Sequence, residues 1–410
     1  MAALPWYKIF LAAGMLITGS INTLSKKAQN DCSAKGLKDM SGNAYHSFDH
    51  PWFQTLIMFC GETLCLIGLI YHRRKVRMAA QEEMLVDPLG APQTSEVSSN
   101  QRVCQLIFML PTVCDLFGTT LSGIGLLYVD ASIWQMLRGS IIVFTGVFSK
   151  IFLKRDLKAT HWIGMGTAML GLLLVGLSTI LRQNHTVSQW HTILGVILIV
   201  SSQIVSATQM VIEETFLKKR NFHPLHVVGM EGFYGIIFMV ALVLPVVYFI
   251  PGNQHHNSYE NSIDALIMIR NNPKLAVFCV LYLASIAFYN FFGLSVTKSL
   301  TAVHRTLLDA CRTLVVWVVS LFIYYAIDET FGEVWNKTYG MFQVDGFMLL
   351  LIGTAMYNQL IDLSWIRCFR QSSSYPVIQA PDYQIEKDER RSLLSTKSYS
   401  AYDSPSPQVI

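Results

Sequence analysis

The sequence predicts an all-α polytopic membrane protein in which ten transmembrane helices form two inverted five-helix repeats. Three observations predict it: an apolar composition, ten apolar runs of spanning length, and ordered matches between the two halves of the chain. Of the 410 residues, 52% are hydrophobic and only 14% are charged, whereas a soluble globular protein has about 25% charged residues. The chain therefore has too little polar surface for a water-soluble body.

Each apolar run is long enough to cross a bilayer as a helix. The first lacks a small-x-small cleavage site, and we expect it to be retained. The expected divisions are a first repeat over 1–182 with a cytosolic loop at 72–103, a second repeat over 190–365, and a disordered cytosolic tail over 366–410. A second long loop is expected at 251–273. The runs are 5–25, 51–71, 104–127, 131–153, 160–181, 190–212, 225–250, 274–297, 302–326 and 344–364.

Basic segments and glycosylation sequons predict the same orientation. YHRRKVR, LKRDLK, FLKKRN and WIRCFR follow the second, fourth, sixth and tenth runs, so all of them face the cytosol if the N-terminus is cytosolic. The sequons at Asn184 and Asn336 then fall on the lumenal side, where glycosylation takes place. Lys26, Lys27, Lys35 and Lys38 are expected in a lumenal loop, contrary to the rule that positively charged loops lie on the cytosolic side.

The halves of the chain match one another in order. LSKKAQN and HPWFQTLIMFCGE correspond to FLKKRNFHPLHVVGMEG, which aligns Glu62 with Glu231. ASIWQMLRGSIIVFTGVFS corresponds to RTLLDACRTLVVWVVS, which aligns Arg138 with Arg312. Because five is an odd number, the two copies have opposite orientations, an arrangement typical of secondary transporters with a midplane site. Inversion also explains the dissenting Lys26–Lys27, which mirror Lys218–Lys219.

Charged and polar residues inside the apolar runs indicate a functional site, because such groups are costly in a bilayer. An arginine offers a planar fork for carboxylate or phosphate, so Arg138 and Arg312 are candidates for binding an anionic group. The alternative is that each arginine pairs with an acid and fixes helix packing; Asp309, three residues before Arg312, is such an acid. The predicted substrate cavity is lined by Arg138, Gln135, Arg312, Asp309, Asn290 and Tyr289.

Acidic residues inside the runs are candidates for proton coupling or gating. Glu62, Glu231 and Asp115 lie within apolar runs, where burial favours the protonated carboxyl. The alternative is an ion pair with one of the arginines. Glu213 and Glu214, near the end of the sixth run, are expected to be interfacial or gating charges.

Several kinds of site are not predicted. No nucleophile–base constellation, P-loop or Cys/His metal spacing appears, so we expect neither an enzyme, a cofactor nor a metal site, and no cluster of basic residues suggests nucleic-acid binding. Glycines in the third and fifth runs are expected to permit close helix approach; they are Gly118, Gly123, Gly164, Gly166 and Gly171.

The tail contains two short sorting patterns. Glu389 precedes Leu393 and Leu394 in an acidic dileucine, and Tyr375–Ile378 reads YPVI, a tyrosine-based pattern. Adaptor proteins read both patterns as endolysosomal addresses. The predicted location is therefore the lysosomal membrane, with the Golgi, another endomembrane or the mitochondrion as alternatives.

Several segments resemble a known family. TGSINTLSKKA, CDLFGTTL, YVDASIWQMLRGSIIVFTGVFS, MVIEETF and SIAFYNFFGLSVTKSLTAVHRTLLDACRT are similar to those of the drug/metabolite transporter superfamily, within it to subgroup F of solute carrier family 35, and more distantly to chloroquine-resistance-transporter-like proteins. The resemblance covers roughly 5–365. It implies an EamA-like ten-helix fold, alternating access by rocking of the two halves, and an endomembrane location. Family 35 is known for nucleotide-sugar antiport, whereas subgroup F largely lacks assigned substrates.

The sequence thus favours a solute carrier that moves a small polar, anionic or zwitterionic metabolite, with the bilayer and cytosolic adaptor proteins as its other partners. Two alternatives stay open: a Golgi nucleotide-sugar antiporter, and a membrane scaffold or receptor that has lost transport. Whether the protein forms a homodimer is also open.

Overall fold

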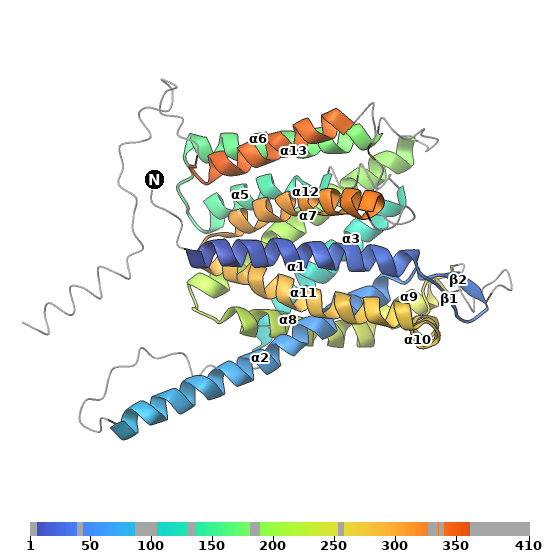
Figure 1. Ribbon diagram of the computed structural model, residues 1–410, viewed down its shortest axis with the longest axis horizontal. Coiled ribbons are helices and arrows are strands. Elements are labelled where there is room, and N and C mark those ends of the chain that lie inside the picture. Colours follow the sequence, from blue (N-terminus) through green and yellow to red (C-terminus); the bar gives the residue numbers. More distant parts are fainter. Residues whose placement is uncertain are drawn as a thin grey trace, which may run out of the picture. The chain divides into compact units, whose positions relative to one another are not determined.

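Long helices that run alongside one another make up almost all of the described chain (Figure 1). The computed structural model describes residues 6–38, 44–86, 105–128, 134, 137–180, 189–252, 258–326, 335 and 340–360. Gln135, Asn184, Asn336 and the tail residues Tyr375, Ile378, Glu389, Leu393 and Leu394 lie outside these ranges.

The helices follow the order of the apolar runs. The first half contains α1 (Trp6–Asp31), α2 (Pro51–Val86), α3 (Met109–Tyr128), α5 (Ile141–Phe152) and α6 (Ala159–Ile180). The second half contains α7 (Gln189–Lys218), α8 (Pro224–Phe238), α9 (Leu244–Phe249), α10 (Ser262–Asn271), α11 (Pro273–Ser299), α12 (Ala302–Ala326) and α13 (Gly340–Tyr357). A 3₁₀ turn, η1 (Leu106–Phe108), precedes α3, and a π-helical segment, η2 (Met239–Val243), joins α8 to α9.

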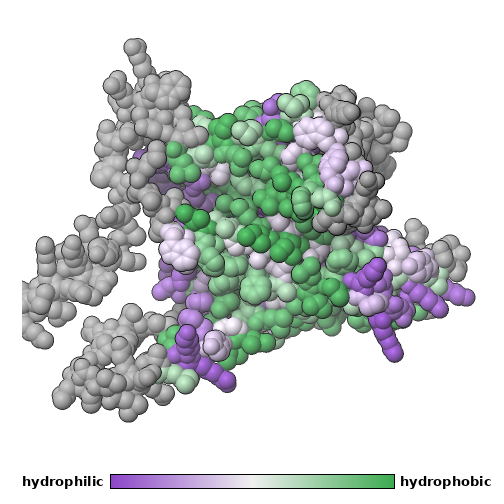
Figure 2. Space-filling view, viewed as in Figure 1, coloured by the Kyte–Doolittle hydropathy of each residue, from purple (hydrophilic) through white to green (hydrophobic). Residues whose placement is uncertain are grey.

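The class of all-α polytopic membrane protein is confirmed. Within the described ranges, nine helices are long and apolar enough to cross a membrane, and α5 is a shorter apolar helix. Hydrophobic side chains cover the middle of the face in Figure 2, and hydrophilic ones gather toward its two ends. Many large apolar side chains are exposed on the spanning helices, whereas several glutamates and glutamines are buried. This inside-out distribution is what a bilayer requires.

Some expected helix ends are wrong. α1 continues to Asp31, so Lys26 and Lys27 lie in the helix and not in a loop. α2 continues to Val86 (Figure 1), so the expected loop at 72–103 begins as helix. The apolar run stops earlier in both cases, but the residues that follow include strong helix formers such as Lys, Arg, Gln and Ala. The expected loop at 251–273 contains α10.

The fourth run also differs from the expectation. A single continuous helix over 131–153 is wrong, because Arg138 lies in a helical turn that ends at Gly139–Ser140, before α5 begins at Ile141. The break therefore comes directly after the arginine that the sequence places inside a spanning helix.

Glycines bring α6 and α13 into close contact. A Cβ atom on Gly171 would lie 2.5 Å from the carbonyl oxygen of Gly346, and one on Gly353 would lie 2.4 Å from the amide nitrogen of Ala168. These distances leave no room for a side chain, as in other closely packed membrane helices. The expectation of close approach is wrong for Gly123 and Gly166, where a Cβ atom would meet nothing within 4 Å.

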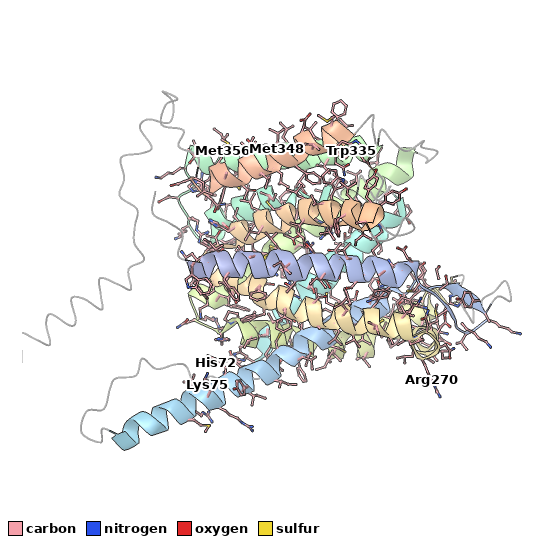
Figure 3. The ribbon with its side chains drawn as sticks, viewed as in Figure 1. His72, Lys75, Arg270, Trp335, Met348 and Met356 are labelled. Carbon is pink, nitrogen blue, oxygen red and sulfur yellow. The ribbon has the colours of Figure 1, made fainter. Side chains whose placement is uncertain are left out.

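A small hairpin and α10 cover one end of the helices. β1 (Ser33–Lys35) pairs antiparallel with β2 (Tyr45–Ser47). The carboxylate of Asp264 on α10 lies 3.3 Å from Nε2 of His46 and 3.4 Å from Nε2 of His50, and it accepts a hydrogen bond from the amide of Leu37. Figure 3 labels Arg270 at this end, and His72 and Lys75 on α2 toward the opposite end.

Candidate functional site

Four carboxylates from four helices form an acid cluster inside the bundle. They are Glu62 on α2, Asp115 on α3, Glu213 on α7 and Glu231 on α8. The three glutamates are buried, Asp115 is half-buried, and the charges of the other three act on Glu231. Gathering so many like charges away from water is unfavourable unless cations or protons compensate them.

One arginine that the sequence did not single out lies at this cluster. Nη1 of Arg305 on α12 is 2.5 Å from Oε2 of Glu213, and both side chains are buried. Oε1 of Glu213 accepts a hydrogen bond from Nε2 of Gln209 at 2.9 Å. Arg305 precedes Arg312 by two helical turns, which puts both on one side of α12. That spacing was the available sequence signal.

The remaining carboxylates of the cluster are less fully compensated. Nδ2 of Asn290 donates to Oε1 of Glu62 at 2.5 Å. Oε1 of Glu231 is buried and has no hydrogen-bond partner among the described residues, and the same holds for Nε of Arg305. A buried carboxylate oxygen without a partner costs about 1–3 kcal/mol or more. The predicted alternative of an ion pair with an arginine is not seen for Glu62 or Glu231 within the described ranges.

A second group surrounds Tyr289 of α11 and is rich in cations. The side chain of Arg312 lies 3.1 Å from Oδ1 of Asp309, and the hydroxyl of Tyr289 donates to the same oxygen at 2.5 Å. The guanidinium of Arg312 lies 5.0 Å from the centroid of the Tyr289 ring. Arg312 thus makes the pairing with Asp309 that its sequence spacing predicts.

Arg138 differs from Arg312. Its side chain is exposed, and its guanidinium lies 4.7 Å from the centroid of the Trp134 ring. No acid forms an ion pair with it in the part of the chain that the structure describes. Asp309 and Arg312 nevertheless act on it electrostatically, as does Lys26 of α1. Arg138 and Arg312 therefore share the carboxylate of Asp309, while the carboxylate that acts on Lys26 is that of Glu260. We call Lys26, Arg138, Arg312 and Asp309 the cation group.

The predicted site residues thus fall into two groups and not one. Asn290 belongs with the acid cluster, whereas its neighbour Tyr289 belongs with the cation group. Arg305 links them, because it pairs with Glu213 and interacts electrostatically with Glu231 of the acid cluster and with Asp309 of the second group. Within the described ranges, no set of three His, Cys, Asp or Glu residues could hold a metal ion. The arrangement can hold an anion and exchange protons.

The chain is similar over most of its length to named transporters. No family model matches it. It is 39% identical over 360 residues to the human protein named solute carrier family 35 member F6, which covers 86% of this chain and 89% of that protein. It is 26% identical over 250 residues to CMP-sialic acid transporter 1 of Arabidopsis thaliana, 60% of this chain and 64% of that protein.

A solved crystal structure supports the fold independently. It matches with a TM-score of 0.53 at 12% identity, and the match covers 87% of this chain and 98% of that one. The curated relatives named solute carrier family 35 member F6 match over 86% to 95% of this chain, with identities of 37% to 39%. The chain therefore belongs to solute carrier family 35, in the group of member F6.

Proposed function

We propose that this solute carrier is a secondary transporter that moves a small polar anionic or zwitterionic metabolite across the lysosomal or late-endosomal membrane by alternating access. One observation carries the proposal: Arg138 is exposed and without an acid partner among the described residues, yet it lies within the electrostatic reach of Arg312 and Asp309 in a set of spanning helices. A fixed charge in that place is expensive unless a ligand uses it.

The cation group suits a ligand that carries a carboxylate or phosphate. Arg138 and Arg312 would each present a guanidinium fork to the anion, while Asp309 would accept the ammonium of a zwitterion. The helix break at Gly139–Ser140 supports this assignment, because discontinuous helices commonly form the substrate sites of secondary transporters. Trp134, whose indole donates to Ser122 at 2.8 Å, holds the guanidinium of Arg138 from one side.

The proposed fold is ten helices in two inverted five-helix repeats, and the packing of the helices supports it. The most extensive contacts are α6 with α13, α1 with α11, α3 with α7 and α2 with α8. In the two repeats, α1 corresponds to α7, α2 to α8, α3 to α11 and α6 to α13. Exchange of the repeats therefore converts the α1–α11 contact into the α7–α3 contact, and it leaves the α2–α8 and α6–α13 contacts unchanged. A two-fold relation between the halves accounts for this pattern.

Proton coupling is the second part of the proposal. Glu231, Glu62 and Asp115 meet in the acid cluster with Glu213, and Arg305 is the one cation paired there among the described residues. Such a cluster takes up protons readily, so an acidic lumen would supply the driving force. The acidic dileucine at Glu389–Leu394 and YPVI at Tyr375–Ile378 support a lysosomal address, and the sequons at Asn184 and Asn336 support the orientation.

The experiment that tests the function is transport by the purified full chain in proteoliposomes. Candidate substrates would come from a metabolomic comparison of lysosomes with and without the protein. Saturable flux of an enriched anion or zwitterion, accelerated by an imposed proton gradient, is expected. Properly folded protein that moves none of the enriched metabolites would instead favour a scaffold or receptor.

A nucleotide-sugar antiporter is the second candidate, because a relative is named CMP-sialic acid transporter 1. Its phosphates would bind the same arginines. Proteoliposomes loaded with CMP would distinguish the two, since an antiporter exchanges labelled CMP for external nucleotide sugar.

A further inference from the structure

One carboxylate, that of Glu214, ties together three separate segments where α7 ends and α12 begins. Oε1 of Glu214 lies 2.7 Å from Nη2 of Arg155, in the linker between α5 and α6, and 2.9 Å from Nζ of Lys218 on α7. Oε2 accepts a hydrogen bond at 3.0 Å from the backbone amide of Ala302, the first residue of α12. Its neighbour Glu213 holds Arg305 of the same helix. We call this the Glu214 tie.

Glu214 and its two cationic partners differ in their exposure to water. Glu214 is fully buried, but the side chains of Arg155 and Lys218 are 26% and 30% exposed. Each cation therefore has access to water, whereas its departure would leave the buried carboxylate of Glu214 with fewer partners, which is unfavourable. The α12 amide and the carboxylate have a favourable helix-terminus interaction that re-forms the contact.

The opposite end is held without such ion pairs: Glu260 there accepts hydrogen bonds from the amides of Trp52 and Phe53, but no Lys or Arg forms an ion pair with it among the described residues. The internal alignment that pairs Lys26 with Lys218 puts Asn22 of α1 at the position of Glu214. Asn22 is neutral, and its hydrogen-bond partner is the hydroxyl of Ser285 at 3.5 Å. In an inverted repeat, closure of one end with release of the other is what alternating access requires. Among the described residues, the α7/α12 end is thus the one held by Lys and Arg ion pairs, and the sequence predicts this end to be cytosolic.

α12 connects this end to the cation group. Ala302 and Arg305 are bound by Glu214 and Glu213, and Asp309 and Arg312 lie farther along the same helix. Ala302 and Asp309 are separated by roughly 10 Å of helix rise. A ligand that displaces Asp309 or Arg312 therefore also displaces the first turn of α12, which is bound to Glu214.

We infer that Glu214 is the positioning residue of a gate, and this inference rests on the proposed transport function. The contacts of Glu214 to Arg155, Lys218 and the first turn of α12 close the α7/α12 end, and they break in each transport cycle. No substrate contact is assigned to Glu214. The sequence predicts that Glu213 and Glu214 are interfacial or gating charges; the structure separates them, with Glu213 in the acid cluster and Glu214 at the end of the bundle.

Two readouts on the full chain test the gate without any substrate. The first is hydrogen–deuterium exchange at residues 301–306, which should become about tenfold faster or more in Glu214→Gln, because a buried ion-pair network has lost its charge. The second is labelling of native Cys114 on α3, beside the acid cluster, by a membrane-impermeant maleimide added to sealed vesicles. Peptide mass spectrometry follows that one thiol. Labelling should rise from the α7/α12 side and stay unchanged from the other side.

The matched control is Glu260→Gln. Glu260 is also buried and also binds a helix start, through the amides of Trp52 at 2.9 Å and Phe53 at 2.7 Å, but at the end covered by α10. This variant should speed exchange near residue 52 and leave Cys114 unlabelled from the α7/α12 side. Lys218→Gln, which removes one of the three donors, provides a milder variant if Glu214→Gln fails to fold.

Faster exchange at residues 301–306 without side-specific labelling of Cys114 would overturn the gate. That result is expected if Glu214 only stabilises the start of α12 and does not control access to Cys114. Labelling from both sides would overturn it as well. Neither readout depends on flux, so the expected exchange and labelling in a protein that transports nothing would reject the transport proposal and still show that Glu214 closes the α7/α12 end.

Discussion

At the scale of single residues, Arg138 carries the most specific prediction. Arg138→Ala should raise the KM for the transported anion by about tenfold to a hundredfold, the range expected for one hydrogen bond to a charged group. Arg138→Lys should recover part of the loss, because lysine keeps the charge but not the fork. Flux in proteoliposomes measures both.

The control for this prediction is Arg270→Ala on α10, an exposed arginine outside the spanning segments. It should leave KM unchanged. An Arg138→Ala variant with normal stability and wild-type KM would show that the anion binds elsewhere.

Asp264 carries a prediction about pH. Burial alone would raise the pKa of its carboxyl, but the imidazoles of His50 and His46 beside it and the hydrogen bond from the Leu37 amide lower that pKa below its usual range. A carboxyl with a lowered pKa stabilises the fold fully above its unfolded pKa of about 4 and loses this contribution as the pH falls through the folded pKa.

Asp264→Asn should therefore lower the melting temperature at pH 5–7, by an amount equivalent to about 1–3 kcal/mol, and the difference from wild type should shrink as the pH falls below about 4. Thermal unfolding of detergent-solubilised protein between pH 7 and pH 3 measures it. Asp156→Asn, at an exposed position, should show no such trend. A constant difference at every pH would contradict the assignment.

At the scale of elements, the contact of α6 with α13 can be tested by adding a single methyl group. Gly171→Ala places a Cβ atom 2.5 Å from the carbonyl oxygen of Gly346, whereas Gly166→Ala, on the same helix, meets nothing within 4 Å. The first should destabilise the protein by about 1–3 kcal/mol, and the second should be neutral or stabilise it by up to about 1 kcal/mol. Thermal unfolding decides, and equal melting temperatures for both variants would contradict the packing.

The elements also show what the sequence could predict. Spanning helices follow from apolar run length, since the bilayer sets it, and nine of the ten expected runs correspond to helices long enough to span. Helix ends do not follow, because α1 and α2 continue through polar residues with high helix propensity. The hairpin of β1 and β2 could not be predicted, because strands of three residues are too short to show an alternation of apolar and polar side chains.

Pairings between helices were the least predictable part of the site. The Asp309–Arg312 pair follows from spacing within one helix. The Arg305–Glu213 and Arg155–Glu214 pairs join segments far apart in the sequence, and no local pattern specifies them. Glu62 and Glu231 could be identified as intramembrane charges, but their neighbours depend on how four helices pack.

At the scale of the whole molecule, coupling to protons is the last prediction, and Glu231 is its test. Its Oε1 has no hydrogen-bond partner among the described residues, and the charged side chains that act on it are those of Glu213, Glu62, Asp115 and Arg305. Glutamine keeps the shape of the side chain but neither binds nor releases a proton. Glu231→Gln should therefore lose the acceleration by an imposed proton gradient, by about tenfold or more, while exchange of substrate at equal pH continues.

Comparing the two kinds of flux separates coupling from binding, because equilibrium exchange needs an intact substrate site but no net proton movement. Asp156→Asn, at an exposed acid outside the acid cluster and the cation group, should retain gradient-driven uptake. If Glu231→Gln also retains it, then Glu62→Gln and Asp115→Asn decide whether another member of the cluster carries the proton. Wild-type acceleration in all three variants would mean that the acid cluster fixes helix packing and that another ion drives the transporter.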